Sequence, residues 1–294
     1  MNTTIYMYCI QFCQVCILFF LFTALFFLDI VIMKNLKLIT LITIFIFEIT
    51  CATSPTGRSR ILLVKDPEMN QSGIEAFQEI KSKTPIETGA RQNTYVKCIA
   101  NAILDVVNDD TGVQSWEIVV FKDDTANAFA LPGGKIGVHT GILPVAKTSG
   151  QLAAVLGHEV AHVLARHGAE RVSDAQIVNK GMGAVGSASG NNSAVMGALG
   201  AGAKFGVMLP FSRKHESEAD ILGLEYMAKA GFDPKESVEL WKNMAAMGGS
   251  KPMEIMSTHP SDETRMKQLN DKLPDANKLY NEAIEKGKRP NCSL

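Results

Sequence analysis

Hydrophobic residues are distributed unevenly along the 294-residue chain. The first 50 residues contain two long apolar runs, "CILFFLFTALFFLDIVIM" from Cys16 to Met33 and "LKLITLITIFIFEITC" from Leu36 to Cys51. Beyond Cys51 the chain has the mixed composition of an ordinary globular domain. We therefore treat residues 1–50 as a targeting segment and leave them out of the fold prediction.

The apolar spacing beyond Cys51 predicts strands early in the chain. Residues 51–90 are mixed and turn-rich, and we expect an N-terminal arm there. Apolar residues recur at helical spacing over 92–108, which predicts an amphipathic helix. Strand-like runs follow over 116–123 and 127–143, the second broken by Pro132, Gly133 and Gly134.

A helical body is expected after these strands. One long helix is predicted from about residue 150 to about 172, further helices over 216–230 and 234–247, and another beginning within "THPSDETRMKQL". The Gly- and Ala-rich segment 181–206 is either a mobile flap or a closely packed helical hairpin. Helices outnumber strands, and the strands come together, so we predict an α+β fold with a small mixed sheet.

Net charge and the number of cysteines limit the kinds of partner and metal site that the chain can have. The net charge of −1 and the absence of a Lys/Arg run give no reason to expect nucleic acid as a partner. Beyond Cys51 only Cys98 and Cys292 remain, and neither belongs to a CxxC pair. A cysteine zinc site is therefore not expected, whereas a disulfide between the two would require an oxidising compartment.

Two interpretations of the apolar segment remain open. From Met1, residues 10–33 are long enough to span a bilayer. From Met33, "MKNLKLITLITIFIFEITC" is a signal peptide ending at Cys51, and this cysteine resembles the lipidated residue of a bacterial lipoprotein. Glu48 and Thr50 depart from that signal, and a plain signal peptide is the alternative. In both cases we expect an exported, membrane-associated protein facing the periplasm, most simply an outer-membrane lipoprotein anchored at Cys51.

The predicted long helix carries "VLGHEVAHVLARH". His158 and His162 are four residues apart and therefore lie on one helix face, where two ring nitrogens can bind one zinc ion. Glu159 is placed to act as a general base toward a zinc-activated water. The flanking residues are apolar, which indicates a buried helix in which polar side chains need partners.

A catalytic zinc usually has a third protein ligand. His167 is rotated off the shared face, and we expect it at the helix C-terminus, while Glu170 lies roughly 12 Å beyond His162 along the helix. Glu216 and Asp220, four apart in "SRKHESEADILGLEYMAKAG", offer carboxylates on one face beside the small residues Ala219 and Gly223. One carboxylate would bind zinc and the other would accept the second N–H of a ligating histidine, but the spacing does not say which.

The motifs HEVAH, SRxxExEAD and THP with an arginine six residues after its histidine together resemble the M48 family of zinc metallopeptidases over about residues 90–270. The resemblance implies a zincin-like domain over 91–273 with a tail over 274–294, and one zinc ion per chain. It also implies that Glu216 is the third ligand and Asp220 the carboxylate behind a ligating histidine. By the same resemblance His259 and Arg265 line the active site, and the strand containing Asn127, Ala128 and Phe129 faces the substrate.

We therefore expect an exported zinc endopeptidase that acts on unfolded or damaged polypeptides of the envelope. A chaperone-like assembly factor that uses the zinc domain mainly for binding is the alternative, and a purely structural zinc lipoprotein is a third. Glu159 argues against the third, because a structural site needs no base beside its ligand.

Overall fold

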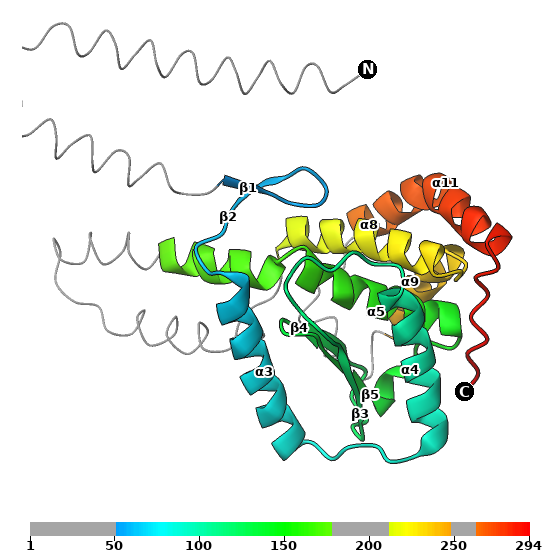
Figure 1. Cartoon of the computed structure of the whole chain (residues 1–294). Helices are drawn as coiled ribbons and strands as arrows, with labels where there is room; N and C mark the ends of the chain where they lie inside the picture. Colours follow the sequence, from blue (N-terminus) through cyan, green and yellow to red (C-terminus); the bar gives the residue numbers. More distant parts are fainter. Residues whose placement is uncertain (1–50, 178–211, 248–262) are drawn as a thin grey trace, which may run out of the picture. The chain divides into compact units, whose positions relative to one another are not determined.

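The computed structural model describes residues 51–177, 212–247 and 263–294 (Figure 1). At its centre lies a sheet of three strands, β3 (Glu117–Phe121), β4 (Ala128–Leu131) and β5 (Lys135–His139). The order is β3-β5-β4, with β5 parallel to β3 and antiparallel to β4. This mixed sheet among helices confirms the predicted α+β class.

The two faces of the sheet pack against different helices because side chains alternate along each strand. Val119, Phe121 and Leu131 face α3 (Asp66–Lys83), where they form a small cluster around the buried Phe77. Val120, Ile136 and Val138 belong to the main core, which α4 (Ala90–Leu104) and α5 (Ser149–Leu164) complete. The sheet is thus covered by α3 on one face and by α4 and α5 on the other (Figure 1).

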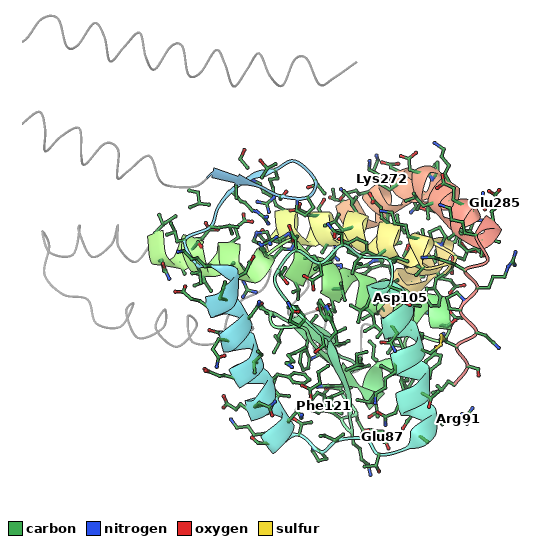
Figure 2. All side chains as sticks on the ribbon, in the orientation of Figure 1. Glu87, Arg91, Asp105, Phe121, Lys272 and Glu285 are labelled. Carbon is green, nitrogen blue, oxygen red and sulfur yellow. A yellow bond between two sulfur atoms is a disulfide. The ribbon has the colours of Figure 1, made fainter. Side chains whose placement is uncertain are left out.

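The helical body packs around α5. The helix α8 (Arg213–Lys229) contacts both α5 and α11 (Glu263–Glu285), and α9 (Lys235–Met247) packs on α5. Lys272 and Glu285 are exposed on α11, while its residues Leu269, Ala276 and Ala283 are buried (Figure 2). The helix α11 continues through residue 273, the boundary expected for the tail, as far as Glu285.

The prediction of a single helix from about residue 150 to about residue 172 was wrong. The helix α5 ends at Leu164, Ala165 caps it, and Arg166 has a φ of 56°. The chain then begins a new helix, which covers residues 167–177 within the described part. A non-glycine residue in the left-handed region breaks the helical ladder, and apolar periodicity alone does not reveal such a break.

The N-terminal arm contains more regular structure than its sequence indicates. It begins with a hairpin of β1 (Cys51–Thr53) and β2 (Ser59–Ile61), followed by α3. The helix α3 was not predicted, although its buried residues Gly73 and Phe77 are four apart, which is helical spacing. The sharp turn after β4 was predicted, and Gly133 and Gly134 occupy it with positive φ.

The C-terminal end of the chain is tied to the body. A disulfide joins Cys98 of α4 to Cys292, which answers the question that the sequence left open. Within the described residues no helix is long and apolar enough to cross a bilayer. The predictions for residues 1–50, for the segment 181–206 and for His259 lie outside the described residues.

Candidate metal centre and active site

The helix α5 presents His158, Glu159 and His162 from the interior of the protein. Thr148 caps its N-terminus by accepting a hydrogen bond from the Gln151 N–H, and nearly every later residue is buried. The Nε2 atoms of His158 and His162 lie 3.0 Å apart, so both rings point toward one place. The i, i+4 spacing seen in the sequence therefore does bring the two imidazoles together.

The helix α8 brings a carboxylate to the same place. Ser212 caps this helix, and Glu216 in its first turn is completely buried. Its Oε2 lies 3.4 Å from His158 Nε2, and its Oε1 lies 3.4 Å from His162 Nε2. The structure thus groups His158, His162 and Glu216, with one ligand atom from each within 4.8 Å of the others.

These distances fit a metal ion. Two ligand atoms at about 2.0–2.1 Å from a tetrahedral ion lie roughly 3.3 Å from each other. The two Nε2 atoms, 3.0 Å apart, are close to that separation, and each of them lies 3.4 Å from a different oxygen of the Glu216 carboxylate. Two imidazoles and one carboxylate are also the donor set of many catalytic zinc sites, which leave a fourth position open.

The Nδ1 atoms of His158 and His162 face away from the cluster and are hydrogen-bonded to other residues. His158 Nδ1 lies 3.0 Å from Asp220 Oδ1, and His162 Nδ1 lies 3.0 Å from His167 Nδ1. Since a carboxylate only accepts, His158 donates its Nδ1 proton to Asp220, and its Nε2 is left as the ligand atom. Asp220 thus occupies the place expected of a carboxylate behind a ligating histidine.

Arg265 is buried beside these carboxylates. Its Nε and Nη2 donate to Asp220 at 2.6 and 2.8 Å, its Nη1 lies 2.8 Å from Glu216 Oε2, and its guanidinium stacks over Trp241. Arg265 therefore lies beside the candidate ligands, with its charge placed on two carboxylates. Its expected contact with a reaction intermediate stays a prediction.

The electrostatics of the site favour a cation. Burial alone lowers the pKa of His158, but Asp220 and Glu216 outweigh it and raise this pKa to about 10. Burial raises the pKa of Asp220, but the hydrogen bonds from Arg265 and His158 dominate and lower it. A site that so strongly favours a positive imidazole also favours a divalent cation.

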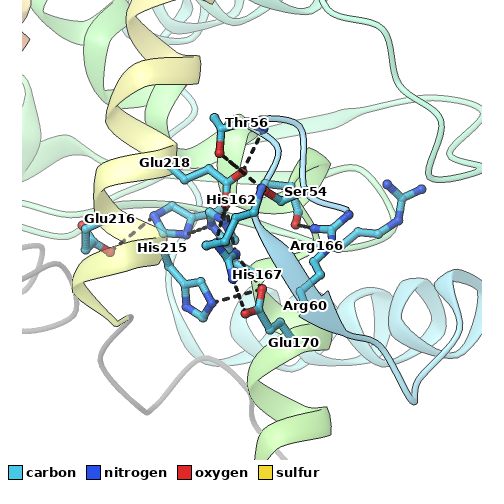
Figure 3. Close-up of polar contacts among 12 residues, drawn as sticks. Ser54, Thr56, Arg60, His162, Arg166, His167, Glu170, His215, Glu216 and Glu218 are labelled. Atoms are coloured by element: carbon cyan, nitrogen blue, oxygen red, sulfur yellow. Dashed lines mark hydrogen bonds and ion pairs between the residues drawn. The ribbon is translucent and has the colours of Figure 1, made fainter. Parts of the chain in front are cut away.

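His167 behaves differently from the prediction. It begins the second helical segment instead of ending α5, and it is fully buried. Burial lowers its pKa to about 4, so it is neutral and does not act as a cation at a helix end. Its Nε2 lies 3.1 Å from Glu218 Oε2 (Figure 3).

The predicted substrate strand is an edge strand. Within the described part of the chain, β4 pairs only with β5, and β4 packs against α5. Ala128 belongs to the main core, while the Phe129 ring packs against Phe77 and Phe121 on the other face. Asn127, just before β4, is buried, and its carbonyl accepts from the His139 N–H. These side chains face the interior, so β4 would contact a partner through the hydrogen-bonding groups of its backbone.

An apolar pocket adjoins the metal centre. His158 and Glu159 form part of its wall, together with Asp220 and Arg265. The rest of the wall is largely apolar and includes Leu224, Met227, Leu240, Trp241, Met244 and Leu269. Such a cavity suits a large apolar side chain placed beside the candidate base Glu159.

Sequence reasoning missed four residues near the centre. His167 was expected at the helix C-terminus, Glu218 was not proposed as a site residue, and Thr56 and Arg58 lie in the N-terminal arm. Glu218 does face away from Glu216, but it is buried, and it accepts hydrogen bonds from the other three. The only sequence signal was a third acidic residue, Glu218, between Glu216 and Asp220.

Comparison with known proteins agrees with this geometry. Residues 90–273 match the sequence model of peptidase family M48. Mitochondrial metalloendopeptidase OMA1 of Saccharomyces cerevisiae is 36% identical over 252 residues, which cover 78% of this chain and 70% of the relative. OMA1 of Schizosaccharomyces pombe is 42% identical over 163 residues, or 55% of this chain and 48% of the relative.

A bacterial relative is also similar. The beta-barrel assembly-enhancing protease of Escherichia coli K12 is 29% identical over 206 residues, which cover 67% of this chain and 42% of the relative. The chain therefore spans about half the length of the S. pombe and E. coli relatives. All matched regions include more than half of this chain.

Proposed function

Because this chain belongs to peptidase family M48, we propose that it is a zinc-dependent endopeptidase that hydrolyses peptide bonds of unfolded or damaged polypeptides. The observation that carries the proposal is the convergence of His158, His162 and Glu216 beside Glu159, at the wall of an apolar pocket. The relatives named as metalloendopeptidases support the same class of reaction.

Each residue of the centre has a chemical task under this proposal. His158, His162 and Glu216 would hold a zinc ion, which when bound would supply a Lewis acid toward water and the scissile carbonyl. Glu159, buried next to the first ligand, accepts a proton from the attacking water and passes it to the leaving amine. Asp220 fixes the His158 ring through the hydrogen bond at Nδ1.

Substrate would bind in an extended conformation. Within the described residues one edge of β4 is not paired with another strand, and this edge beside α5 can pair with a peptide backbone, a mode of recognition that depends little on side chains. The apolar pocket would accept one large side chain of the peptide. Unfolded polypeptides expose both extended backbone and apolar side chains.

We further propose that His259 and Arg265 stabilise charge on the reacting carbonyl oxygen, with Arg265 also holding Glu216 and Asp220 in place.

We also propose that the substrates are proteins of the cell envelope and that the N-terminal segment holds the enzyme at a membrane. The name of the E. coli relative, a beta-barrel assembly-enhancing protease, supports the first part. The names of the yeast relatives make a mitochondrial location the alternative. Mass spectrometry of the mature N-terminus would show whether Cys51 carries a lipid, and fractionation would identify the compartment.

The decisive experiment measures zinc content and casein hydrolysis for the wild type and for Glu159→Gln. The variant should keep its zinc and lose cleavage, because the amide keeps the size of the side chain but cannot act as a base. Glu225→Gln, a change at a half-buried residue of α8 outside the centre, is the matched control and should cleave normally. Cleavage by Glu159→Gln would overturn the proposal. Complementation of a deletion strain by Glu159→Gln would favour the chaperone-like alternative.

A further inference from the structure

A line of buried hydrogen bonds leads from the metal ligand His162 to the N-terminal hairpin (Figure 3). His162 Nδ1 lies 3.0 Å from His167 Nδ1, and His167 Nε2 lies 3.1 Å from Glu218 Oε2. All three residues are almost completely buried. Water therefore does not compete for these contacts, and the orientation of each ring depends on its protein partner.

One assignment of protons satisfies the whole line. Glu218 accepts, so the proton of His167 lies on Nε2, and its Nδ1 is an acceptor. His162 must then donate from Nδ1, which leaves Nε2 unprotonated and directed at His158 Nε2 and Glu216 Oε1. Glu218 thus selects, through His167, the tautomer of His162 that can bind a metal ion.

The hairpin in turn holds Glu218. Its loop donates to Glu218 Oε1 from the Thr56 N–H at 3.2 Å and from the Thr56 hydroxyl at 2.7 Å. Arg58 donates to Glu218 Oε2 from Nε at 3.2 Å and from Nη2 at 2.9 Å. Arg58 is itself fixed by two hydrogen bonds to Glu170, at 2.5 and 2.7 Å. Every oxygen of Glu218 therefore has a donor from the hairpin.

The hairpin lies outside the region that the family match covers. Its strands have three residues each, and an isolated hairpin of that size is unstable in water. Thr56 and Arg58 stand between these strands, so the contacts with Glu218 join the hairpin to α8 directly beside the metal centre. The candidate ligands lie within residues 90–273, but some of the hydrogen bonds that hold the residues behind them come from residues 54–58.

We propose that His167 and Glu218 are positioning residues for the metal ligand His162, and that the hairpin Cys51–Ile61 completes the metal centre through Thr56 and Arg58. This inference rests on the proposed function, because it assigns a support to the same zinc site. It predicts that changes in the hairpin weaken zinc binding, although none of its residues touches the ion.

The test measures zinc affinity of the full-length protein by competition with a chromophoric chelator. His167→Ala should weaken zinc binding about 10–100-fold, the effect of removing a hydrogen-bond partner behind a ligand. Arg58→Met and Thr56→Val should also weaken it, each by less than His167→Ala. Glu218→Gln keeps an oxygen that accepts from His167 and should bind zinc more tightly than Glu218→Ala.

Arg60→Met is the matched control. Arg60 lies in the same hairpin and is more deeply buried than Arg58, but it donates to the carbonyls of Ala165 and Thr53 and has no hydrogen bond to Glu218. If the hairpin only stabilises the fold, Arg58→Met and Arg60→Met will lower the unfolding temperature and leave zinc affinity unchanged, which would overturn the inference. Should Arg58→Met fail to fold, Thr56→Val, which removes a single hydroxyl, decides the question by the same measurement.

The two proposals fail in different ways. A wild type that binds zinc but cleaves no casein contradicts the proposed peptidase, whereas the zinc affinities of the variants still test the support of His162. Unchanged affinity in His167→Ala and Glu218→Ala overturns the inference and leaves the peptidase intact. A wild type that binds no zinc overturns both.

Discussion

The backbones of Gly157 on α5 and Gly223 on α8 touch where the two helices cross. A Cβ on Gly223 would lie 2.7 Å from the His158 nitrogen, and one on Gly157 would lie 2.8 Å from the Gly223 carbonyl oxygen. These helices carry all three candidate ligands, so the missing side chains set the distance between His158 and Glu216. Gly223 is one of the two small residues that the sequence places beside Glu216 and Asp220, and the absence of a side chain there allows the close approach of α5.

Gly223→Ala should therefore damage both stability and zinc binding. The added methyl meets backbone atoms, which cannot rotate away, so the helices must separate at a cost of about 1–3 kcal/mol. Thermal unfolding and chelator competition measure the two effects. Gly168→Ala is the control, because its Cβ would meet only the flexible end of Met69 at 3.5 Å, and this variant should be neutral or slightly stabilising. A fully stable, zinc-binding Gly223→Ala would show that the crossing does not position the ligands.

Arg265→Met should make the protein dependent on zinc for stability. The change leaves Asp220 and Glu216 buried without their guanidinium, and breaking a buried ion pair costs about 3–5 kcal/mol. A bound divalent cation offsets part of that charge. The fall in unfolding temperature should accordingly be larger in EDTA than in zinc. Arg166→Met, which removes a pair with Asp66, should lose the same stability in both buffers.

Acid should destabilise the protein partly through Glu170. Burial raises the pKa of Glu170, but Arg58 and His215 outweigh it, and the pKa in the folded protein lies below its ordinary value. A carboxyl group with a lowered pKa stabilises the fold above its unfolded pKa of about 4.3, and this stabilisation is lost as the pH falls through the folded pKa. Glu170→Gln should thus be less stable at neutral pH and lose less on acidification, as measured by urea unfolding at several pH values. An unchanged acid dependence would remove Glu170 from this role.

The disulfide should stabilise the fold without supporting the metal centre. It closes a loop with a sequence separation of 194, from α4 to the C-terminal residues, and such a link contributes about 2–4 kcal/mol. Cys98→Ser, Cys292→Ser and the double variant should all lower the unfolding temperature by the same amount, because each breaks the same bond. Zinc affinity should stay at the wild-type value. Unequal losses among the three variants would point to a role of one thiol outside the bond.

The apolar pocket should select the residue on one side of the cleaved bond. Its wall contains leucine, methionine and tryptophan side chains beside His158 and Glu159. Peptides with Leu, Met or Phe at that position should be cleaved more efficiently than peptides with Asp or Lys, because a buried charge there has no partner. Cleavage-site profiling with a peptide library measures the preference. A flat profile would mean that the pocket does not hold substrate.

Local sequence was enough to predict the features of this protein that depend on the geometry of one helix turn or one strand. The spacing of His158 and His162 predicts a shared face, and the turn residues after β4 predict the break between two strands. These features depend on backbone geometry that repeats over a few residues. The choice of Glu216 over Asp220 as a ligand came from resemblance, and the structure places Glu216 at the Nε2 atoms of both histidines and Asp220 at Nδ1 of His158.

Only the tertiary structure decided what surrounds the ligands. Arg166 breaks the helix that periodicity predicted to continue, and this brings His167 back against His162. Thr56 and Arg58 reach Glu218 across about 160 residues of sequence, and hydrophobic periodicity and short motifs do not predict contacts at that separation. Hydrogen bonds at such separations depend on how helices and hairpins pack in three dimensions, so sequence pattern predicts the metal-binding histidines but not the buried partners that orient them.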